Sequence, residues 1–191
     1  MYSDGAQIYQ MLRGGPWAEV HQARAMVASS LVTPLRPAEW DGALLDRCSQ
    51  FQKSGTDGIL MRLYLVMHHA DAGRWAPALV HLEAATALYP RVQKTFDAHL
   101  IPEILVMTAL LKQDPAAARW WWHQFESKRK RADGLGYWSA RTAWHWMEGH
   151  TADAWQALQQ WEERAQKLPR TGAYDYDRRQ AALLRTGTRQ P

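Results

Sequence analysis

The stretch GRWAPALVHLEAATALYP, residues 73–90, decides the fold. Counted from Gly73, it places the small residues Ala78 and Ala85 at offsets of 5 and 12, and a proline at an offset of 17. Small side chains at these offsets let two antiparallel helices approach closely, and glycine permits a tight turn between them. Proline ends the unit, because it cannot continue the hydrogen-bonding pattern of a helix. The stretch therefore predicts the second helix of a closely packed hairpin.

Two later segments, KQDPAAARWWWHQF (112–125) and EGHTADAWQALQQW (148–161), repeat part of this pattern. Each keeps a turn residue and a small residue five positions later, which are Gln113 with Ala118 and Gly149 with Ala154. The three turns are 40 and 36 residues apart, close to the period of helical-hairpin repeats. All three segments resemble the tetratricopeptide repeat, although Phe125 and Trp161 replace the second alanine in the later two.

The composition also favours helices. Alanine and leucine together number 49, whereas the β-branched valine and isoleucine number 11; unbranched side chains lose little rotamer freedom in a helix. No segment alternates apolar and polar residues as a strand would. The resemblance implies an all-α fold, an array of antiparallel helix hairpins that forms a tetratricopeptide-like right-handed solenoid.

Glycines, prolines and capping residues divide the chain into about ten expected helices. These helices cover residues 3–13, 16–32, 37–53, 59–72, 74–89, 92–112, 115–130, 137–148, 151–168 and 176–184. A turn is expected over SGTDG (54–58), and Pro102 marks either the true start of its helix or a kink. Grouped into domains, the chain has N-terminal helices and a linker over 1–36, the hairpin array over 37–170, and a C-terminal helix with a frayed tail over 171–191.

Charge and cysteine content narrow the protein class. The formal net charge is +4, and 47% of the residues are hydrophobic, as in a folded globular protein. The lone Cys48 fits a reducing compartment, and the longest apolar stretch (100–111) contains Glu103 and is too short to span a bilayer. We therefore expect a cytoplasmic location, with possible tethering to the inner membrane in a longer parent chain.

One basic run, which comprises Lys128, Arg129, Lys130 and Arg131, ends an expected helix. Cations are favoured there by the helix dipole, so a solvated helix end is one interpretation. The other interpretation is an anion-binding site for phosphate or lipid headgroups. No nucleic-acid partner is expected from so modest an overall charge.

Tryptophan is over-represented, with 11 residues, of which eight fall within 120–161. Bulky rings can fill wide gaps between hairpins, they can line a concave groove that binds a peptide, or they can form a face that lies near a membrane. The candidate partner-binding residues are Trp120, Trp121, Trp122, Trp144 and Trp146.

No complete catalytic or metal-binding motif is present. His68 and His69 are adjacent, so on a helix they point about 100° apart and do not readily share a metal ion. The run HWMEGH (145–150) differs by one residue from the inverted zincin pattern H-x-x-E-H. We therefore expect no catalytic residue and no cofactor in this chain alone.

The N-terminus carries a second resemblance. The segments YSDGAQIYQMLRGGP (2–16) and SSLVTPLRPAEWD (29–41) resemble the region after the core membrane helices in bacterial site-2 protease family intramembrane metallopeptidases. In that family an Asp-Gly pair supplies the third zinc ligand beside an upstream H-E-x-x-H helix, and Asp4 and Gly5 match this pair. This chain has neither the H-E-x-x-H motif nor an expected membrane helix, so it holds no catalytic zinc by itself.

Together these patterns predict a non-catalytic helical-repeat domain that binds a protein or peptide, as the cytosolic portion of a site-2 protease-like membrane protein. One alternative is a portion of an active intramembrane zinc metallopeptidase, in which Asp4 is a zinc ligand. A second alternative is a lipid- or nucleic-acid-binding helical protein that uses the basic run. The oligomeric state is open.

Overall fold

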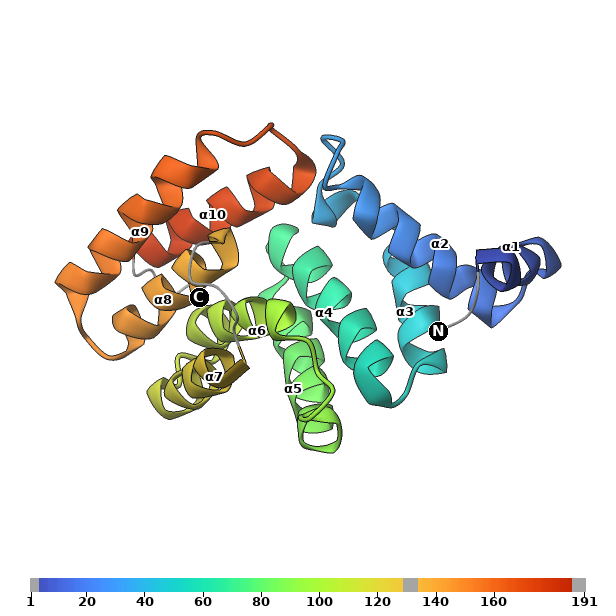
Figure 1. The fold of residues 1–191 in the computed structure, drawn as a ribbon, viewed down its shortest axis with the longest axis horizontal. Coiled ribbons are helices and arrows are strands. Elements are labelled where there is room, and N and C mark those ends of the chain that lie inside the picture. The colour runs from blue at the N-terminus through green and yellow to red at the C-terminus, as the bar shows by residue number, and fades with distance from the viewer. Residues whose placement is uncertain (1–3, 129–133, 187–191) are drawn as a thin grey trace. The chain divides into compact units, whose positions relative to one another are not determined.

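The computed structural model describes residues 4–128 and 134–186, and this part of the chain is entirely helical with no strand (Figure 1). The expected all-α class is therefore confirmed. The chain divides into two compact units: unit 1 comprises residues 1–93 with 171–173, and unit 2 comprises residues 94–170 with 174–191.

The described helices of unit 1 are α1 (Asp4–Arg13), α2 (Pro16–Ser29), the 3-10 helix η1 (Pro37–Glu39), α3 (Gly42–Phe51), α4 (Gly55–Asp71) and α5 (Trp75–Val92). Those of unit 2 are the 3-10 helix η2 (Ala98–Leu100), α6 (Ile101–Met107), the π-helix η3 (Thr108–Lys112), α7 (Pro115–Lys128), α8 (Leu135–Met147) and α9 (Thr151–Ala165). The last helix, α10 (Gly172–Thr186), begins with two residues of unit 1 and continues in unit 2.

All three turns expected from the repeat pattern lie between helices and take a left-handed backbone conformation. Gly73 has φ of 71°, Gln113 of 50° and Gly149 of 76°. The residues five and twelve positions after each turn are all buried; they are Ala78, Ala85, Ala118, Phe125, Ala154 and Trp161. The spacing therefore identified both the turns and the contact positions of the three helices that follow them.

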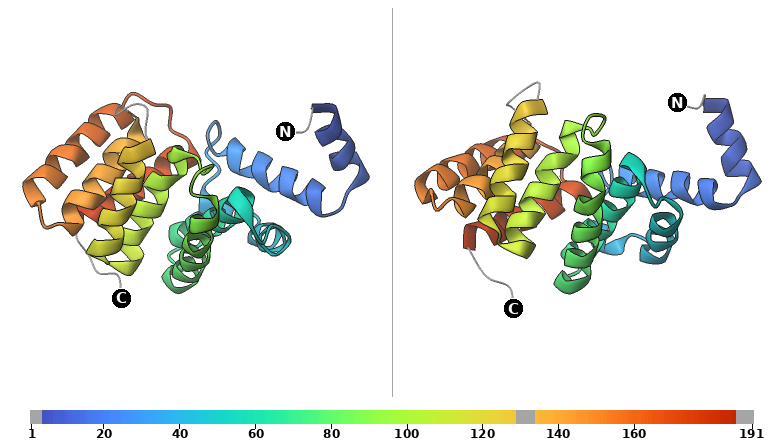
Figure 2. Two further views of the ribbon diagram at one scale, coloured as in Figure 1. Left: turned by 60° about the horizontal axis from the view of Figure 1, so that its bottom comes forward. Right: turned by 90° about the horizontal axis from the view of Figure 1, so that it is seen from below.

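Unit 1 has a core between α2, α3 and α4, and α4 packs along α5. Trp40 lies in this core, where its indole N–H donates a 2.8 Å hydrogen bond to Ser30 Oγ. Asp41 caps α3, because its side chain accepts a 2.9 Å hydrogen bond from the Leu44 N–H. In the same unit, Figure 2 shows α1, in dark blue, extending from the start of α2.

Unit 2 is held together by α6 packing against α7 and α8, and by α8 packing against α9. Trp122 of α7 stacks on Trp144 of α8, with ring centroids 4.7 Å apart and planes within 1° of parallel. A further core cluster forms between α9 and α10 around Leu158, Trp161 and Ala181. Trp161 of this cluster thus occupies the position, twelve residues after the turn, at which the stretch 73–90 has Ala85.

Several expected helix boundaries were wrong. The expected helix over 37–53 is divided before Gly42, because the capping residue Asp41 starts a new helix. Gly55 already begins α4, within the expected turn. Pro90 lies inside α5, which continues for two residues to Val92, although a proline there removes one intrahelical hydrogen bond and crowds the carbonyl group four residues earlier.

The expected helix over 92–112 was wrong in its first third. Residues 93–97 connect two helices, and the Asp97 carboxylate accepts a hydrogen bond from the His99 N–H at the start of η2. Pro102 is in the first turn of α6, where its missing N–H costs no hydrogen bond. Of the two alternatives for Pro102, the structure therefore shows the helix start.

Within the described residues, none of the helices has the length and apolar character needed to cross a bilayer.

Candidate functional site

The expected aromatic surface is divided between the core and the solvent. Trp121 and Trp122 are buried, and Trp122 is only 7% exposed, whereas Trp120 is 43% exposed. Trp144 and Trp146 are partly buried. The three consecutive rings of α7 therefore face different surroundings, and the use of the five residues by a partner stays a prediction.

The other residues predicted from sequence lie at the edges of what the structure describes. Lys128 ends α7, while Arg129, Lys130 and Arg131 are outside the described residues. Asp4 begins α1, and its side chain is likewise outside the described part.

A groove of about 500 Å³ lies between α9 and α10 in unit 2. These two helices run side by side (Figure 1). The groove is lined by two aromatic residues, Trp161 and Tyr174, and by three arginines, Arg170, Arg178 and Arg185. Its composition is therefore both aromatic and basic.

The arginines of this groove differ in their partners. Arg185 forms an ion pair with Glu162, which also lines the groove. Arg170 and Arg178 are exposed and form no ion pair or side-chain hydrogen bond with any residue that the structure describes. Two guanidinium groups are thus available to bind carboxylates or phosphates.

A pair of acidic side chains lies elsewhere in unit 2, on α6 and α10. Glu103 Oε1 accepts a 2.6 Å hydrogen bond from the Tyr176 hydroxyl and a 3.2 Å hydrogen bond from Gln180 Nε2. Burial raises the pKa of Glu103, although the two hydrogen bonds, taken alone, would lower it. Burial, together with the nearby Glu103, raises the pKa of Asp177 to about 7. Protonation of these groups is therefore linked to the packing of α10.

His68 and His69 of unit 1 contact neighbouring groups of the same unit. The Nδ1 atom of His68 is 2.9 Å from the Pro37 carbonyl oxygen, and its Nε2 is 2.6 Å from Arg74 Nη2. His69 stacks on His81 with ring centroids 5.3 Å apart, and burial lowers the pKa of His69 to about 4. His68 thus uses both ring nitrogens, and His69 stays neutral at physiological pH.

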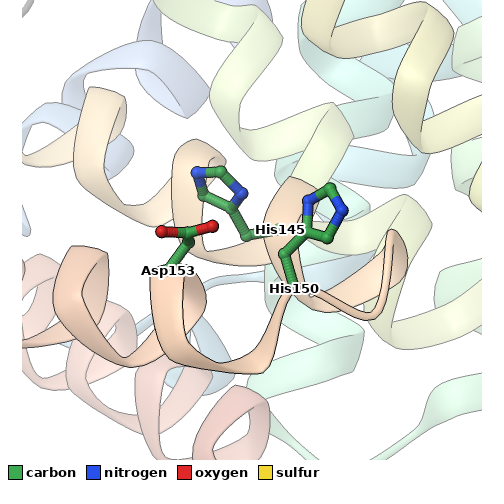
Figure 3. A group of neighbouring side chains, drawn as sticks. All are labelled: His145, His150 and Asp153. Atoms are coloured by element: carbon green, nitrogen blue, oxygen red, sulfur yellow. The ribbon is translucent and has the colours of Figure 1, made fainter.

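In the HWMEGH segment (145–150), the glutamate does not join the two histidines as the sequence pattern suggests. The Glu148 carboxylate pairs with Arg119 of α7, at 2.9 Å to Nε and 2.8 Å to Nη2. His145 and His150 instead lie near Asp153 of α9, as Figure 3 shows. Within the described parts of the chain, this is the place where three metal-ligating side chains come together.

Sequence reasoning missed the α9–α10 groove and the position of Asp153 near His145 and His150. Arg178 and Arg185 are seven residues apart, so they share one face of a helix, and this spacing was a usable signal. The pairing of that face with Trp161 could not be inferred, because it depends on how α10 docks against α9.

The chain matches no protein-family model, no curated protein and no solved structure.

Proposed function

We propose that this chain is a non-catalytic helical-repeat domain that binds an acidic segment of a partner protein in the α9–α10 groove. The observation that carries this proposal is the groove itself, in which Arg170 and Arg178 lack partners among the described residues and line the same groove as Trp161 and Tyr174. A guanidinium group binds a carboxylate through two parallel hydrogen bonds, which gives both affinity and orientation.

The spacing of the arginines along the groove suits a peptide with several acidic side chains better than a small ligand. Arg178 and Arg185 project from one face of α10, about two helical turns apart, and Arg170 lies before the start of that helix. Acidic residues spaced along a peptide can pair with these positions, while an aromatic or apolar residue of the peptide contacts Tyr174. Glu162 would disfavour a peptide carboxylate beside Arg185, so Arg170 and Arg178 supply most of the attraction.

A tetratricopeptide-like architecture is part of this proposal. Support comes from the left-handed turns at Gly73, Gln113 and Gly149 and from the buried positions that follow each of them. Arrays of helical hairpins expose extended concave surfaces on which partners bind.

We further propose, from the resemblance at the N-terminus, that the domain is the cytosolic portion of a site-2 protease-like membrane protein. The exposed apolar side chains of α1 support an attachment to another surface; they are Ile8, Tyr9, Met11 and Leu12. In the alternative, an active metallopeptidase, Asp4 would be a zinc ligand beside an upstream H-E-x-x-H helix. Sequencing the gene upstream of Met1 tests the membrane-protein origin that the two interpretations share. An in-frame H-E-x-x-H within apolar helices would support this origin, and an unrelated gene with its own stop codon would contradict it.

Peptide binding tests the groove directly. We would titrate the full chain into a short fluorescein-labelled peptide rich in glutamate and tyrosine and measure fluorescence anisotropy. Arg178→Gln should weaken binding by about tenfold, since it removes a charge-assisted hydrogen bond. Arg179→Gln is the matched control, because this neighbour is also exposed but does not line the groove.

Rising salt should weaken the wild-type complex, because exposed charge pairs are screened. A lysine-rich peptide of the same length should not bind. Equal affinity of the Arg178 and Arg179 variants, or no binding of the acidic peptide, would refute the proposed groove.

A further inference from the structure

Three metal-ligating side chains meet at the connection between α8 and α9. His145 is in the last turn of α8, His150 immediately precedes α9, and Asp153 is in the first turn of α9. Each offers a ligand atom, and the three atoms lie within 4.8 Å of one another (Figure 3).

The backbone of this connection holds the two histidines in place. Gly149 takes the left-handed conformation that reverses the chain direction. The His150 N–H donates a 2.9 Å hydrogen bond to the His145 carbonyl oxygen, and the His150 carbonyl oxygen accepts a 3.0 Å hydrogen bond from the Ala154 N–H. The backbone positions of the two histidines are therefore fixed by the hairpin and do not depend on a long loop.

His145 gives a second, independent observation. Its side chain is only 6% exposed, and its Nδ1 atom is buried without a hydrogen-bond partner in the described part of the chain. A buried imidazole nitrogen without a partner carries a free-energy cost that a bound ion would remove.

We propose that His145, His150 and Asp153 form a site for a divalent transition-metal ion of the zinc class. Two imidazoles and one carboxylate suit zinc, cobalt or nickel, whereas magnesium and calcium prefer oxygen ligands throughout. Three protein ligands leave a position for water in a tetrahedral site. Ligand atoms in such a site are about 3.4 Å apart, since metal–ligand bonds are about 2.0–2.2 Å long. The exposed side chains of His150 and Asp153 are able to rotate into this arrangement.

Arg141 opposes metal binding at this site. Its Nε donates a 3.3 Å hydrogen bond to His145 Nε2, and its Nη1 lies 3.3 Å from the Tyr137 hydroxyl. A guanidinium group beside the ligands repels a cation. Its hydrogen bond to Nε2 also keeps the ring proton on Nδ1, so an ion that binds Nδ1 must release this bond. Arg141 thus sets how tightly the ion binds.

Isothermal titration of the metal-free full chain with zinc chloride tests the proposal. We expect one ion per chain, with binding weakened at least about tenfold in His150→Ala and in Asp153→Asn. These two residues are exposed, so both variants should keep the wild-type circular dichroism spectrum. His99→Ala is the matched control, because it removes another exposed histidine of unit 2 that lies outside the group.

Arg141→Met should tighten zinc binding, since it removes the opposing charge and frees His145. Cobalt(II) in place of zinc should give visible absorption bands of a four- or five-coordinate site, and these bands should be lost in His150→Ala. The proposal is overturned if the wild type binds no zinc, if binding survives in both ligand variants, or if His99→Ala abolishes it.

Discussion

Gln113 occupies the turn position that Gly73 and Gly149 occupy in the other two hairpins. Its φ of 50° is in the left-handed region, and it is the residue other than glycine found there in the described part of the chain. A side chain with a Cβ atom costs about 1–2 kcal/mol in this conformation. The π-helix η3 directly before it widens the last turn, so that the Gln113 N–H reaches the Thr108 carbonyl oxygen at 3.1 Å.

Gln113→Gly should therefore raise the free energy of unfolding by about 0.5–1 kcal/mol, after the greater freedom of glycine in the unfolded chain is subtracted. Urea denaturation followed by circular dichroism measures this change. The matched control is Gln166→Gly after α9, where the backbone is right-handed and glycine should give no gain. A loss of stability in Gln113→Gly would show that its side chain contributes more than the strain costs.

Asp177 makes stability depend on pH in a direction opposite to that of an ion-paired carboxylate. Its pKa is about 7 in the folded protein, against about 3.9 in the unfolded chain. Between these values the folded state binds more protons, so stability falls as the pH rises and the full penalty is present above pH 7. The raised pKa of Glu103 acts in the same direction.

Asp177→Asn should consequently be more stable than the wild type at pH 8, and this gain should shrink toward pH 4. Urea midpoints at several pH values check the trend. Asp175→Asn is the control, because it makes the same chemical change in the first turn of α10 without touching the Glu103–Asp177 pair. A pH-independent difference between Asp177→Asn and the wild type would rule out the linkage.

At the scale of the element, α7 shows how one helix places identical residues in different surroundings. Successive side chains point about 100° apart, so Trp120 faces solvent while Trp121 and Trp122 face the core. Trp122 also stacks on Trp144 of α8.

Trp122→Ala should lower the free energy of unfolding by about 3–5 kcal/mol, because it leaves a large cavity. The adjacent Trp120→Ala should change it by no more than about 0.5 kcal/mol, as is usual for a surface position. Thermal unfolding of the two variants makes the comparison. Equal losses in both would mean that the stacked pair contributes little to the core.

Local signals predicted the elements well where one residue determines the geometry. The turns at Gly73 and Gly149 required left-handed backbone, and Asp114 caps α7 by accepting a hydrogen bond from the Ala117 N–H. Boundaries were wrong where one residue type occurs in two kinds of position. A proline usually ends a helix, yet Pro90 lies in the last turn of α5. Asp41 was also missed, since a capping aspartate and an ordinary helical aspartate look alike in sequence.

The candidate sites were less predictable than the elements, because they depend on contacts across helices. Glu148 lies between the two histidines of HWMEGH, but Arg119 of another helix pairs with it. Asp153 takes the place beside His145, eight residues along, because the turn at Gly149 folds α9 back against α8. No spacing rule within a single helix relates two residues on opposite arms of a hairpin.

At the scale of the whole molecule, the chain returns to unit 1 near its C-terminus. The Gly172 N–H donates a 2.8 Å hydrogen bond to the Thr33 carbonyl oxygen, and the Ala173 N–H donates a 3.0 Å bond to that of Ser30. A Cβ atom on Gly172 would lie 1.7 Å from the Leu35 carbonyl oxygen, so only glycine fits here without a shift of the backbone.

Gly172→Ala should therefore destabilise unit 1 by roughly 1–3 kcal/mol, as overpacking does elsewhere. Hydrogen exchange of the backbone amides in 30–35 and 171–173 measures the local effect. Gly134→Ala is the control, since a Cβ atom there meets no neighbour within 4 Å. Unchanged exchange in Gly172→Ala would mean that the returning segment does not hold residues 30–35.

This return also sets the order in which the protein can be completed during synthesis. Residues 30–35 leave the ribosome long before residues 171–173 are translated, so α2 to α5 must fold first without their last backbone partners. Contacts between such distant parts of a chain form late and slow the final folding step. A nascent chain stalled before residue 171 should hold a partly finished unit 1, open to chaperones and proteases at residues 30–35, which residues 171–173 later contact.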